Sequence, residues 1–506
     1  MLKRTRSFLV LVMLLMTVTM SAQVTTATMS GKVTAQDEPI IGATIVAIHE
    51  PSGTRYGTVT NVSGQFNLQG MRTGGPYKVE ISYVGYQTAI YKGINLLLGE
   101  NYVLNVSLKE SSELLDEVVV TASKESNMKS DRAGAIMNAN RDMISNTPTI
   151  SRSISDIMRL SPQGADVGNG FAVGGGNYRQ SFVTVDGAAF NNTFGLGGNL
   201  PANGSPISLD ALEQVTVAVT PFDVRQSGFT GGAINAVTRS GDNQFRGTAY
   251  MYFNNENLKG SKVDDYELLR SKAQYYTYGA SFGGPIIKDK LFFFVNGEYE
   301  DNVTAGSNYR PRTALGESYS GGNIHRPLQS DMDDMRGFLL NKYNFDPGKY
   351  NDYSTDTPAY RVMARVDWNA NQNNKVSFRF TKTHTKDSNF PTSSVSPLST
   401  SALYPGGTST EVIDGKPVGT IAPGQGRTSK YALSFSNSNY YQVRDFTSVA
   451  GEWNSRMAQG AMNNMLRFAY SYQDEPRSFD GPLFPTVDIL QDGAVYANFG
   501  ADLFTA

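Results

Sequence analysis

The sequence predicts a mainly β protein with a small β-sandwich domain, a mixed α/β region, and the first part, about seven or eight strands, of a transmembrane antiparallel β-barrel. Three observations predict this class. Before residue 110, short β-favouring runs alternate with turn residues. After residue 245, apolar and aromatic residues alternate with polar ones in segments of about ten residues. The connections between these later segments are alternately short and long, as in barrels that cross a bilayer.

The composition excludes several classes of protein. The 506 residues include 44 lysines and arginines against 46 acidic residues, so the chain lacks the broad basic surface of a nucleic-acid-binding protein. It has no cysteine, which excludes disulfide scaffolds, thiolate zinc sites and cysteine nucleophiles. The mean hydropathy is −0.32, and no apolar run past residue 20 approaches the length of a spanning helix. A low average is also typical of a membrane barrel, because its two strand faces cancel.

Residues 1–22 have the pattern of a secretory signal peptide. A basic start is followed by an unbroken apolar run, residues 8–16, which is too short to span a bilayer. Ser21 and Ala22 are small residues, so cleavage is expected between Ala22 and Gln23. Loss of the segment takes the net charge from −2 to −5, because the segment contains Lys3, Arg4 and Arg6. An exported, cysteine-free chain rich in tyrosine and glycine suits a bacterial envelope.

Residues 24–109 are expected to form the small β-sandwich. Many short strands at close spacing, separated by turn residues, favour this architecture. The expected strands are residues 29–34, 43–49, 57–60, 64–68, 77–83 and 102–108.

A polar linker, residues 110–131, follows the sandwich. It is interrupted by a β-favouring stretch at residues 115–122, between acidic residues and a tail rich in Lys, Ser and Asn. Polar flanks predict an extended, mobile segment. Two interpretations remain open for the β-favouring stretch. It is either an ordinary edge strand or a strand that a partner protein captures by β-augmentation.

Residues 132–240 form the mixed region. Residues 149–160 are expected to form one helix, since their apolar residues share one face and Ser153 and Asp156 have the spacing of a capping box. Residues 181–186 and 214–219 alternate as strands. The glycine-rich residues 168–177 lack the Lys-Ser/Thr of a phosphate loop and the spacing of a dinucleotide fingerprint. A tightly packed loop is therefore expected there.

Residues 245–506 are expected to form part of the barrel. One strand face is apolar and aromatic, and the other is polar and charged. The alternating segments are residues 248–253, 276–283, 293–300, 361–368, 375–381 and 465–472. Residues 430–453 are expected to supply one further strand, because the alternation of short and long connections then holds. An eighth strand is expected near Val495. Seven strands with unpaired edges cannot sit in a bilayer, so the chain is expected to be the N-terminal portion of a longer protein.

The chain resembles the TonB-dependent outer-membrane receptors of Bacteroidetes, in the Oar-like/SusC-like branch. Residues 31–86 look like a carboxypeptidase-regulatory-like domain, and residues 116–122 look like a TonB box. The plug is the third feature, carried by residues 186–190, 211–215 and 228–235, and residues 283–294 look like the second barrel hairpin. The four features in this order are specific, although each alone is weak. The family's barrels have 22 strands, which the 266 residues after position 240 cannot supply.

The resemblance implies a function and a set of site residues. The protein would take up a nutrient (an oligosaccharide, a peptide or a chelate) across the outer membrane with energy from TonB and its inner-membrane complex. The TonB box would comprise Asp116, Glu117, Val118, Val119, Val120 and Thr121. The plug loops expected to contact the ligand contain Asn177, Tyr178, Arg179, Phe190, Asn191 and Asn192. The sandwich, the TonB box and the base of the plug would face the periplasm, and the barrel would face outer-membrane lipid. The sequence identifies neither the nutrient nor a surface lipoprotein partner.

Two other functions compete with transport. The protein could be an outer-membrane binding or adhesion protein whose long loops grip a partner without active transport. An enzyme is suggested only by the peptidase-accessory character of the first domain. Against it, His49, His325 and His384 are scattered through unrelated regions, and no zinc-protease or G-x-S-x-G motif is present. No cofactor, metal or nucleic-acid partner is therefore expected.

Overall fold

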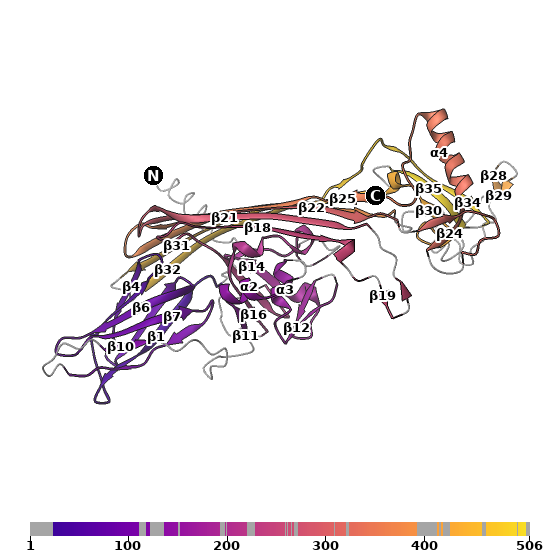
Figure 1. Cartoon of the computed structure of the whole chain (residues 1–506). Helices are drawn as coiled ribbons and strands as arrows, with labels where there is room; N and C mark the ends of the chain where they lie inside the picture. The colour runs from indigo at the N-terminus through magenta and orange to yellow at the C-terminus, as the bar shows by residue number, and fades with distance from the viewer. Residues whose placement is uncertain are drawn as a thin grey trace, which may run out of the picture.

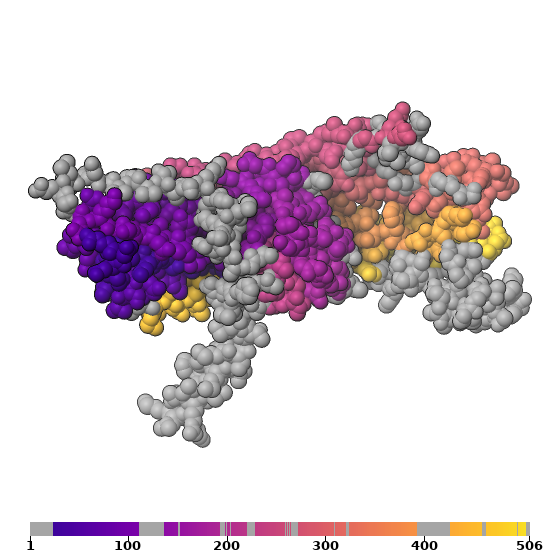
Figure 2. Space-filling model, turned by 90° about the horizontal axis from the view of Figure 1, so that it is seen from below, coloured from indigo at the N-terminus to yellow at the C-terminus, as the bar shows by residue number. Residues whose placement is uncertain are grey.

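The computed structural model describes residues 24–501, except for residues 111–117, 122–135, 150–151, 169, 193–197, 199, 220–227, 259, 261, 265, 268–271, 308, 320–322, 392–411, 414–415, 418–425, 458–461 and 493. Figure 1 shows a long curved sheet with an N-terminal β domain near one end and a lobe at the other. An α/β domain lies against one face of the sheet. From below, the N-terminal domain and the α/β domain lie side by side along the sheet (Figure 2). The predicted mainly β fold is confirmed.

Residues 24–110, with strand β10 added, form the sandwich domain. One sheet has the order β2-β1-β5, with β8 and β9 also paired to β1, and the other has the order β10-β7-β6-β3-β4. The strands are β1 (Ala27–Ala35), β2 (Glu38–Pro39), β3 (Thr44–His49), β4 (Thr54–Val59), β5 (Gln65–Met71), β6 (Gly74–Ser82), β7 (Ala89–Leu96), β8 (Asn101–Val103), β9 (Val106–Ser107) and β10 (Val118–Thr121). Alternate side chains, such as Met29, Leu68 and Ile81, are fully buried in one core.

The predicted runs of the sandwich domain lie on strands, with two differences. Residues 102–108 form two short strands, β8 and β9, each parallel to β1. Strand β7 was missing from the prediction. Its alternation is interrupted at Gly93, whose φ of +77° is a left-handed conformation that favours glycine.

The α/β domain contains a five-stranded sheet with the order β11-β16-β17-β14-β15, and it is called the plug domain below because of the resemblance noted in its sequence. Its elements are β11 (Ile136–Ala139), α2 (Arg141–Asn146), α3 (Ile154–Met158), β12 (Gly164–Asp166), β13 (Phe171–Val173), η1 (Tyr178–Gln180), β14 (Phe182–Val185), β15 (Ala188–Ala189), η2 (Ala202–Gly204), η3 (Leu209–Ala211), β16 (Leu212–Ala218) and β17 (Ala233–Thr238). β17 is buried along its whole length, so it is the central strand of this core.

The helices of the plug domain differ from the prediction. Helix α3 covers only Ile154–Met158 of the expected residues 149–160. Arg152 has a φ of +50°, which is incompatible with an earlier helix start. The expected capping box is present, and the Asp156 carboxylate accepts from the Ser153 backbone N–H at 3.3 Å. Helix α2, capped by Asn140, was missing from the prediction. Among the described residues, no helix has the length and apolar composition needed to cross a membrane.

Seven long antiparallel strands form the curved sheet in the described part of the chain, in the order β18-β21-β22-β26-β27-β31-β32. They are β18 (Arg246–Asn255), β21 (Gln274–Ile287), β22 (Leu291–Ala305), β26 (Ala359–Asn369), β27 (Asn374–Asn389), β31 (Tyr440–Met457) and β32 (Met462–Asp474). The short strands β25 (Ser354–Asp356) and β33 (Arg477–Ser478) pair with β22 and β31. The predicted single strand within residues 430–453 corresponds to β31.

The two faces of this sheet differ as the alternation predicts. Outward side chains are exposed, for example Phe378 at 51% and Phe468 at 64%. Inward side chains are buried although they are polar, for example Arg379 at 2% and Thr383 at 0%. The outward face therefore suits lipid, and the plug domain covers the inward face.

A distal lobe stands at the far end of the sheet (Figure 1). Its elements are β23 (Arg310–Arg312), β24 (Ile324–Leu328), α4 (Gln329–Tyr343), β30 (Leu433–Ser434), η5 (Ser436–Ser438), β34 (Phe484–Gln491) and β35 (Ala494–Ala501). The predicted eighth barrel strand near Val495 is wrong. β35 pairs with β30 and β34, and all eight of its residues are buried, whereas a barrel strand would expose alternate residues. The remaining short elements are β19 (Lys262–Val263), β20 (Tyr266–Glu267), β28 (Val412–Ile413), β29 (Lys416–Pro417) and η4 (Glu256–Leu258).

Candidate functional site

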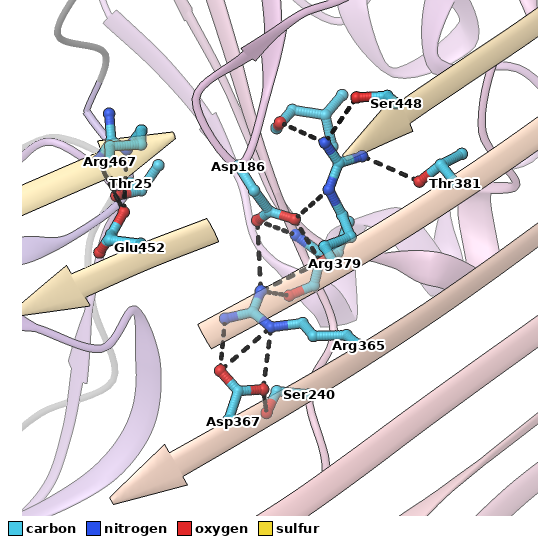
Figure 3. A network of polar contacts seen from close by, with 12 residues as sticks. Thr25, Asp186, Ser240, Arg365, Asp367, Arg379, Thr381, Ser448, Glu452 and Arg467 are labelled. Atoms are coloured by element: carbon cyan, nitrogen blue, oxygen red, sulfur yellow. Dashed lines mark hydrogen bonds and ion pairs between the residues drawn. The ribbon is translucent and has the colours of Figure 1, made fainter. Parts of the chain in front are cut away.

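The candidate site is the interface between the plug domain and the inner face of the barrel sheet. It begins at Asp186, in the two-residue turn between β14 and β15. Asp186 and Gly187 have φ values of +46° and +76°, and an Asp-Gly pair favours such a turn because both residues tolerate positive φ. Thr238 of β17 fixes the carboxylate: its backbone N–H donates to Oδ1 at 3.0 Å and its Oγ1 donates to Oδ2 at 2.6 Å. The carboxylate points at the barrel strands (Figure 3).

Two arginines of the barrel form ion pairs with this carboxylate. Arg365 on β26 and Arg379 on β27 are directly opposite one another in the strand register. Like charges in this position repel, so the pair needs a counter-ion. Asp186 lies between them, with Oδ1 3.3 Å from Arg365 Nη1 and Oδ2 3.1 Å from Arg379 Nε. The plug domain therefore supplies the carboxylate beside Arg379, whereas Arg365 also pairs with Asp367 of the barrel.

Neighbouring groups satisfy the other donors of the two guanidinium groups. Arg365 Nη2 donates to Asp367 Oδ1 at 2.9 Å, and Asp367 also accepts from Ser240. The remaining donors of Arg379 bind three acceptors: Thr381 Oγ1 at 2.9 Å, Ser448 Oγ at 3.1 Å and the Val185 carbonyl at 3.2 Å. A buried charge network of this kind is stable only while its members are present, because removing one leaves the others desolvated and unpaired.

A second cluster joins the plug domain to the barrel around Glu298 of β22. Its Oε1 lies 3.0 Å from Arg361 Nη1, and its Oε2 accepts from Tyr250 OH at 2.6 Å. The plug contributes Ser208, whose Oγ donates to Glu298 Oε2 at 3.0 Å, and the Ser205 carbonyl, which accepts from Arg361 Nε at 2.6 Å. The plug is thus held to the barrel at two separate buried clusters.

The sandwich domain contacts both the plug and the barrel. On the barrel, Thr25 Oγ1 donates to Glu452 Oε2 at 2.6 Å, and Arg467 Nη2 lies 2.7 Å from the same oxygen (Figure 3). On the plug, Gln214 of β16 accepts from the Leu98 backbone N–H at 2.8 Å and donates to the Leu96 carbonyl at 3.1 Å. The end of strand β7 is therefore bonded to the plug sheet.

A cavity of about 570 Å³ lies where the three domains meet. Lys375 lines it, and its Nζ lies 3.0 Å from the centroid of the Tyr56 ring. Within the described part of the chain, this Nζ has no hydrogen-bond acceptor. Burial lowers the pKa of His49 well below its usual 6.5, and the nearby charges of Arg72 and Lys375 lower it further.

The predicted TonB box is only partly described. Val118, Val119, Val120 and Thr121 form β10, which pairs in parallel with β7 of the sandwich domain. Asp116 and Glu117 lie outside the described residues, as do Ala22 and Gln23 of the expected cleavage site. β10 is thus an edge strand of the sandwich domain, and capture of this strand by a partner stays a prediction.

The six predicted plug-loop residues lie in two places. Three are in or next to η1, and the other three follow β15 directly. Asn177 caps η1, with its Oδ1 accepting from the Arg179 backbone N–H at 2.9 Å, and Arg179 Nε donates to Tyr178 OH at 3.0 Å. Asn191 has a structural role: its Oδ1 accepts from the Val183 backbone N–H at 2.7 Å. Asn192 follows it and is partly buried.

Phe190 does not fit the role of a ligand contact. Its side chain is fully buried, and its ring centroid lies 4.7 Å from that of Phe446 on the barrel. Arg379 stacks over the same ring at 5.1 Å. The ring is therefore part of the packing between plug and barrel beneath the charged cluster.

The prediction from sequence missed Arg365 and Arg379 as functional residues. In the sequence both arginines lie in alternating barrel segments, and Asp186 lies in a predicted strand and in a plug motif. The available signal was the pair of arginines on the inner faces of successive strands, since opposed like charges need an anion nearby.

Comparison with known proteins identifies two domains. Residues 28–109 match the carboxypeptidase regulatory-like domain, and residues 237–414 match an outer membrane beta barrel domain. The chain is 27% identical over 256 residues to the TonB-dependent transporter Oar of Myxococcus xanthus, covering 49% of this chain and 22% of Oar. It is 29% identical over 269 residues to the TonB-dependent receptor SusC of Bacteroides thetaiotaomicron, covering 50% of this chain and 24% of SusC. The chain thus spans less than a quarter of the length of these two relatives.

The chain also matches part of a solved structure, that of the outer membrane transporter YddB from Escherichia coli. The TM-score is 0.46 at 11% sequence identity, and the match covers 70% of this chain and 40% of YddB.

The chain combines a carboxypeptidase regulatory-like domain with an outer membrane β-barrel domain and is a protein of the outer membrane. With the named relatives, this combination is consistent with an Oar/SusC-like TonB-dependent receptor.

Proposed function

We propose that the protein imports a nutrient across the outer membrane with energy transduced by TonB. The observation that carries this proposal is the pair of opposed arginines, Arg365 and Arg379, whose counter-ion Asp186 belongs to the plug. A plug bound in this way blocks passive flow, and moving it requires work against buried charge pairs. The segment that could receive this work, β10, precedes the plug in the chain.

In this proposal the parts of the chain act one after another during import. TonB captures the strand Val118–Thr121 by backbone hydrogen bonds, which require no particular side chains. The pull separates Asp186 from Arg365 and Arg379 and opens a path along the inner face of the barrel. Ligand bound above the plug then moves inward.

We propose that the ligand first contacts the η1 loop of the plug. Asn177, Tyr178 and Arg179 offer an amide, a phenol and a guanidinium at a part of the plug where no described side chain of the η1 helix is buried. These groups suit an oligosaccharide, a peptide or a chelate. A surface lipoprotein partner is compatible with this arrangement and has no specific support in it.

We also propose that the protein is a receptor and not an enzyme. The three histidines make separate contacts: His49 with Ser52 Oγ, His325 with the Ala432 carbonyl, and His384 with Asp445. Among the described residues, no group of three His, Asp or Glu side chains is placed to hold a metal ion. The competing function, adhesion without transport, predicts binding that does not depend on TonB.

Uptake by the variant Val119→Pro tests the proposal. Proline removes a backbone donor from β10, so energised import should be lost while ligand binding at the cell surface persists. The measurement is accumulation of labelled oligosaccharides, peptides and ferric chelates in cells with and without TonB.

The matched control is Val119→Ala, which keeps the backbone donor and should import as the wild type does. Unimpaired import by Val119→Pro, or accumulation in cells that lack TonB, would contradict the proposal. Binding without accumulation of any probe in wild-type cells would favour adhesion.

A further inference from the structure

Strand β10 is the outermost strand of a sheet in the sandwich domain (Figure 1). Its four residues pair in parallel register with the first half of β7, from Val118 opposite Ala89 to Thr121 opposite Lys92. The other side of β7 pairs with β6. The described part of the predicted TonB box, Val118–Thr121, is therefore held as a formed strand on the sandwich domain.

The edge of β7 that faces β10 has a regular part and a break. Ala89 and Ile90 are buried in the sandwich core, and Lys92 is exposed. The next residue, Gly93, has a φ of +77°, which departs from strand geometry and interrupts the regular edge of β7. β7 thus offers an edge of four regular residues, and β10 is four residues long.

A strand that is paired on one side keeps a second edge. Successive residues direct their backbone groups to alternate sides, so half of the backbone groups of β10 face away from β7. Among the described strands, none pairs with that outer edge. Such an edge is a template for the addition of another strand.

We propose that the edge of β7 is a docking site for Val118–Thr121, and that the docked strand is presented to TonB with its outer edge free. TonB then adds as the next strand of the sheet. This inference rests on the proposed function, because it identifies how the same segment is recognised. Presentation favours capture because the strand is already ordered, and the cost of ordering it does not fall on the binding step.

A disulfide across the docked strands tests the docking. The chain has no cysteine, so Lys92→Cys with Thr121→Cys introduces the only two thiols. Directly opposite residues on neighbouring strands, about 4.8 Å apart, are within disulfide range. The control pair, Lys92→Cys with Val118→Cys, places the thiols about 10 Å apart along the strands in the observed register. Mild oxidation in outer-membrane preparations should link the first pair and not the second, as read by mass spectrometry.

The same variant tests the presentation. Oxidised and reduced forms are compared for affinity toward the purified periplasmic domain of TonB. We expect the oxidised form to bind at least as tightly as the reduced form. A loss of tenfold or more on oxidation would overturn presentation, since it would show that the docked strand is withheld from TonB.

The outcomes distinguish this inference from the proposed function. Failure of the first pair to link, or equal linking of the control pair, overturns the docking whatever TonB does. Normal linking without TonB binding in either redox state overturns the proposed function and the presentation with it, and supports the docked strand alone.

Discussion

Asp186 carries the interaction between plug and barrel at the scale of single residues. Because Asp367 still pairs with Arg365, we expect Asp186→Asn to remove the carboxylate beside Arg379, at a cost on the order of 3 kcal/mol in plug stability. The measurement is the urea concentration at which a protease first cuts the plug of the membrane-inserted protein. The control Asp142→Asn changes an exposed carboxylate of the same domain and should leave this midpoint unchanged. Equal midpoints for the wild type and Asp186→Asn would contradict the assignment.

His49 gives the sandwich domain a pH dependence. Its lowered pKa means that the folded domain keeps the ring neutral, whereas the unfolded chain takes up a proton near the ordinary value of 6.5. Acidification below 6.5 therefore favours unfolding, by up to about 1.4 kcal/mol per pH unit, and stability is regained as the pH rises. Amide hydrogen exchange in β3 and β6 between pH 7 and pH 5 should reveal this slope. His49→Gln should abolish the slope, and a slope that survives the substitution would assign it to another group.

Only some of these residues could be predicted from the sequence. The capping pair Ser153 and Asp156 was found because both lie within one turn of chain. Arg379 and Asp186 were not brought together, because they are 193 positions apart and only the folded hairpin turn aims one at the other. The burial of Phe190 could not be predicted from the local sequence either, because it depends on Phe446 of a different domain.

Strand register is the clearest determinant at the scale of elements. Gly279 of β21 is directly opposite Tyr250 of β18, and a methyl group at Gly279 would overlap the tyrosine ring, 2.0 Å from its nearest atom. We expect Gly279→Ala to displace the ring, break its hydrogen bond to Glu298 and cost about 1–3 kcal/mol. Heat-induced loss of β-sheet circular dichroism should occur at a lower temperature.

The barrel offers a matched control for this substitution. Gly297 lies on the neighbouring strand β22, and an added methyl group there meets no atom within 4 Å. Gly297→Ala should therefore be close to neutral. If the two alanine variants unfold at the same temperature, the ring of Tyr250 does not depend on the space at Gly279.

The strands of the barrel were predictable because each has one lipid-facing side, and that side imposes a period of two on the sequence. β35 was misassigned because it is buried on both faces, and a buried strand has no such period. Helix α4 was missed for a related reason: only Met332 and Leu339 of its 15 residues are buried, so it lacks a continuous apolar stripe.

At the scale of the whole molecule, the order of the parts could be predicted and their contacts could not. The order follows from local composition, as the two matched domains at residues 28–109 and 237–414 illustrate. The contact between sandwich and plug depends instead on Gln214, a side chain 116 residues from the backbone group of Leu98 that it binds. Nothing in the local pattern of β16 distinguishes this glutamine from a solvent-exposed one.

Gln214 therefore supplies a prediction for the assembled molecule. Its side chain is 3% exposed and satisfies two buried backbone groups of the sandwich domain. Gln214→Leu should leave the Leu98 N–H and the Leu96 carbonyl without partners, at about 1–3 kcal/mol for each group. Exchange of the Leu98 amide hydrogen should then accelerate at least tenfold, because each 1.4 kcal/mol corresponds to about a factor of ten. Gln65→Leu, on the exposed face of β5, should leave that exchange rate unchanged. An unchanged rate in Gln214→Leu would mean that other contacts hold the sandwich domain to the plug.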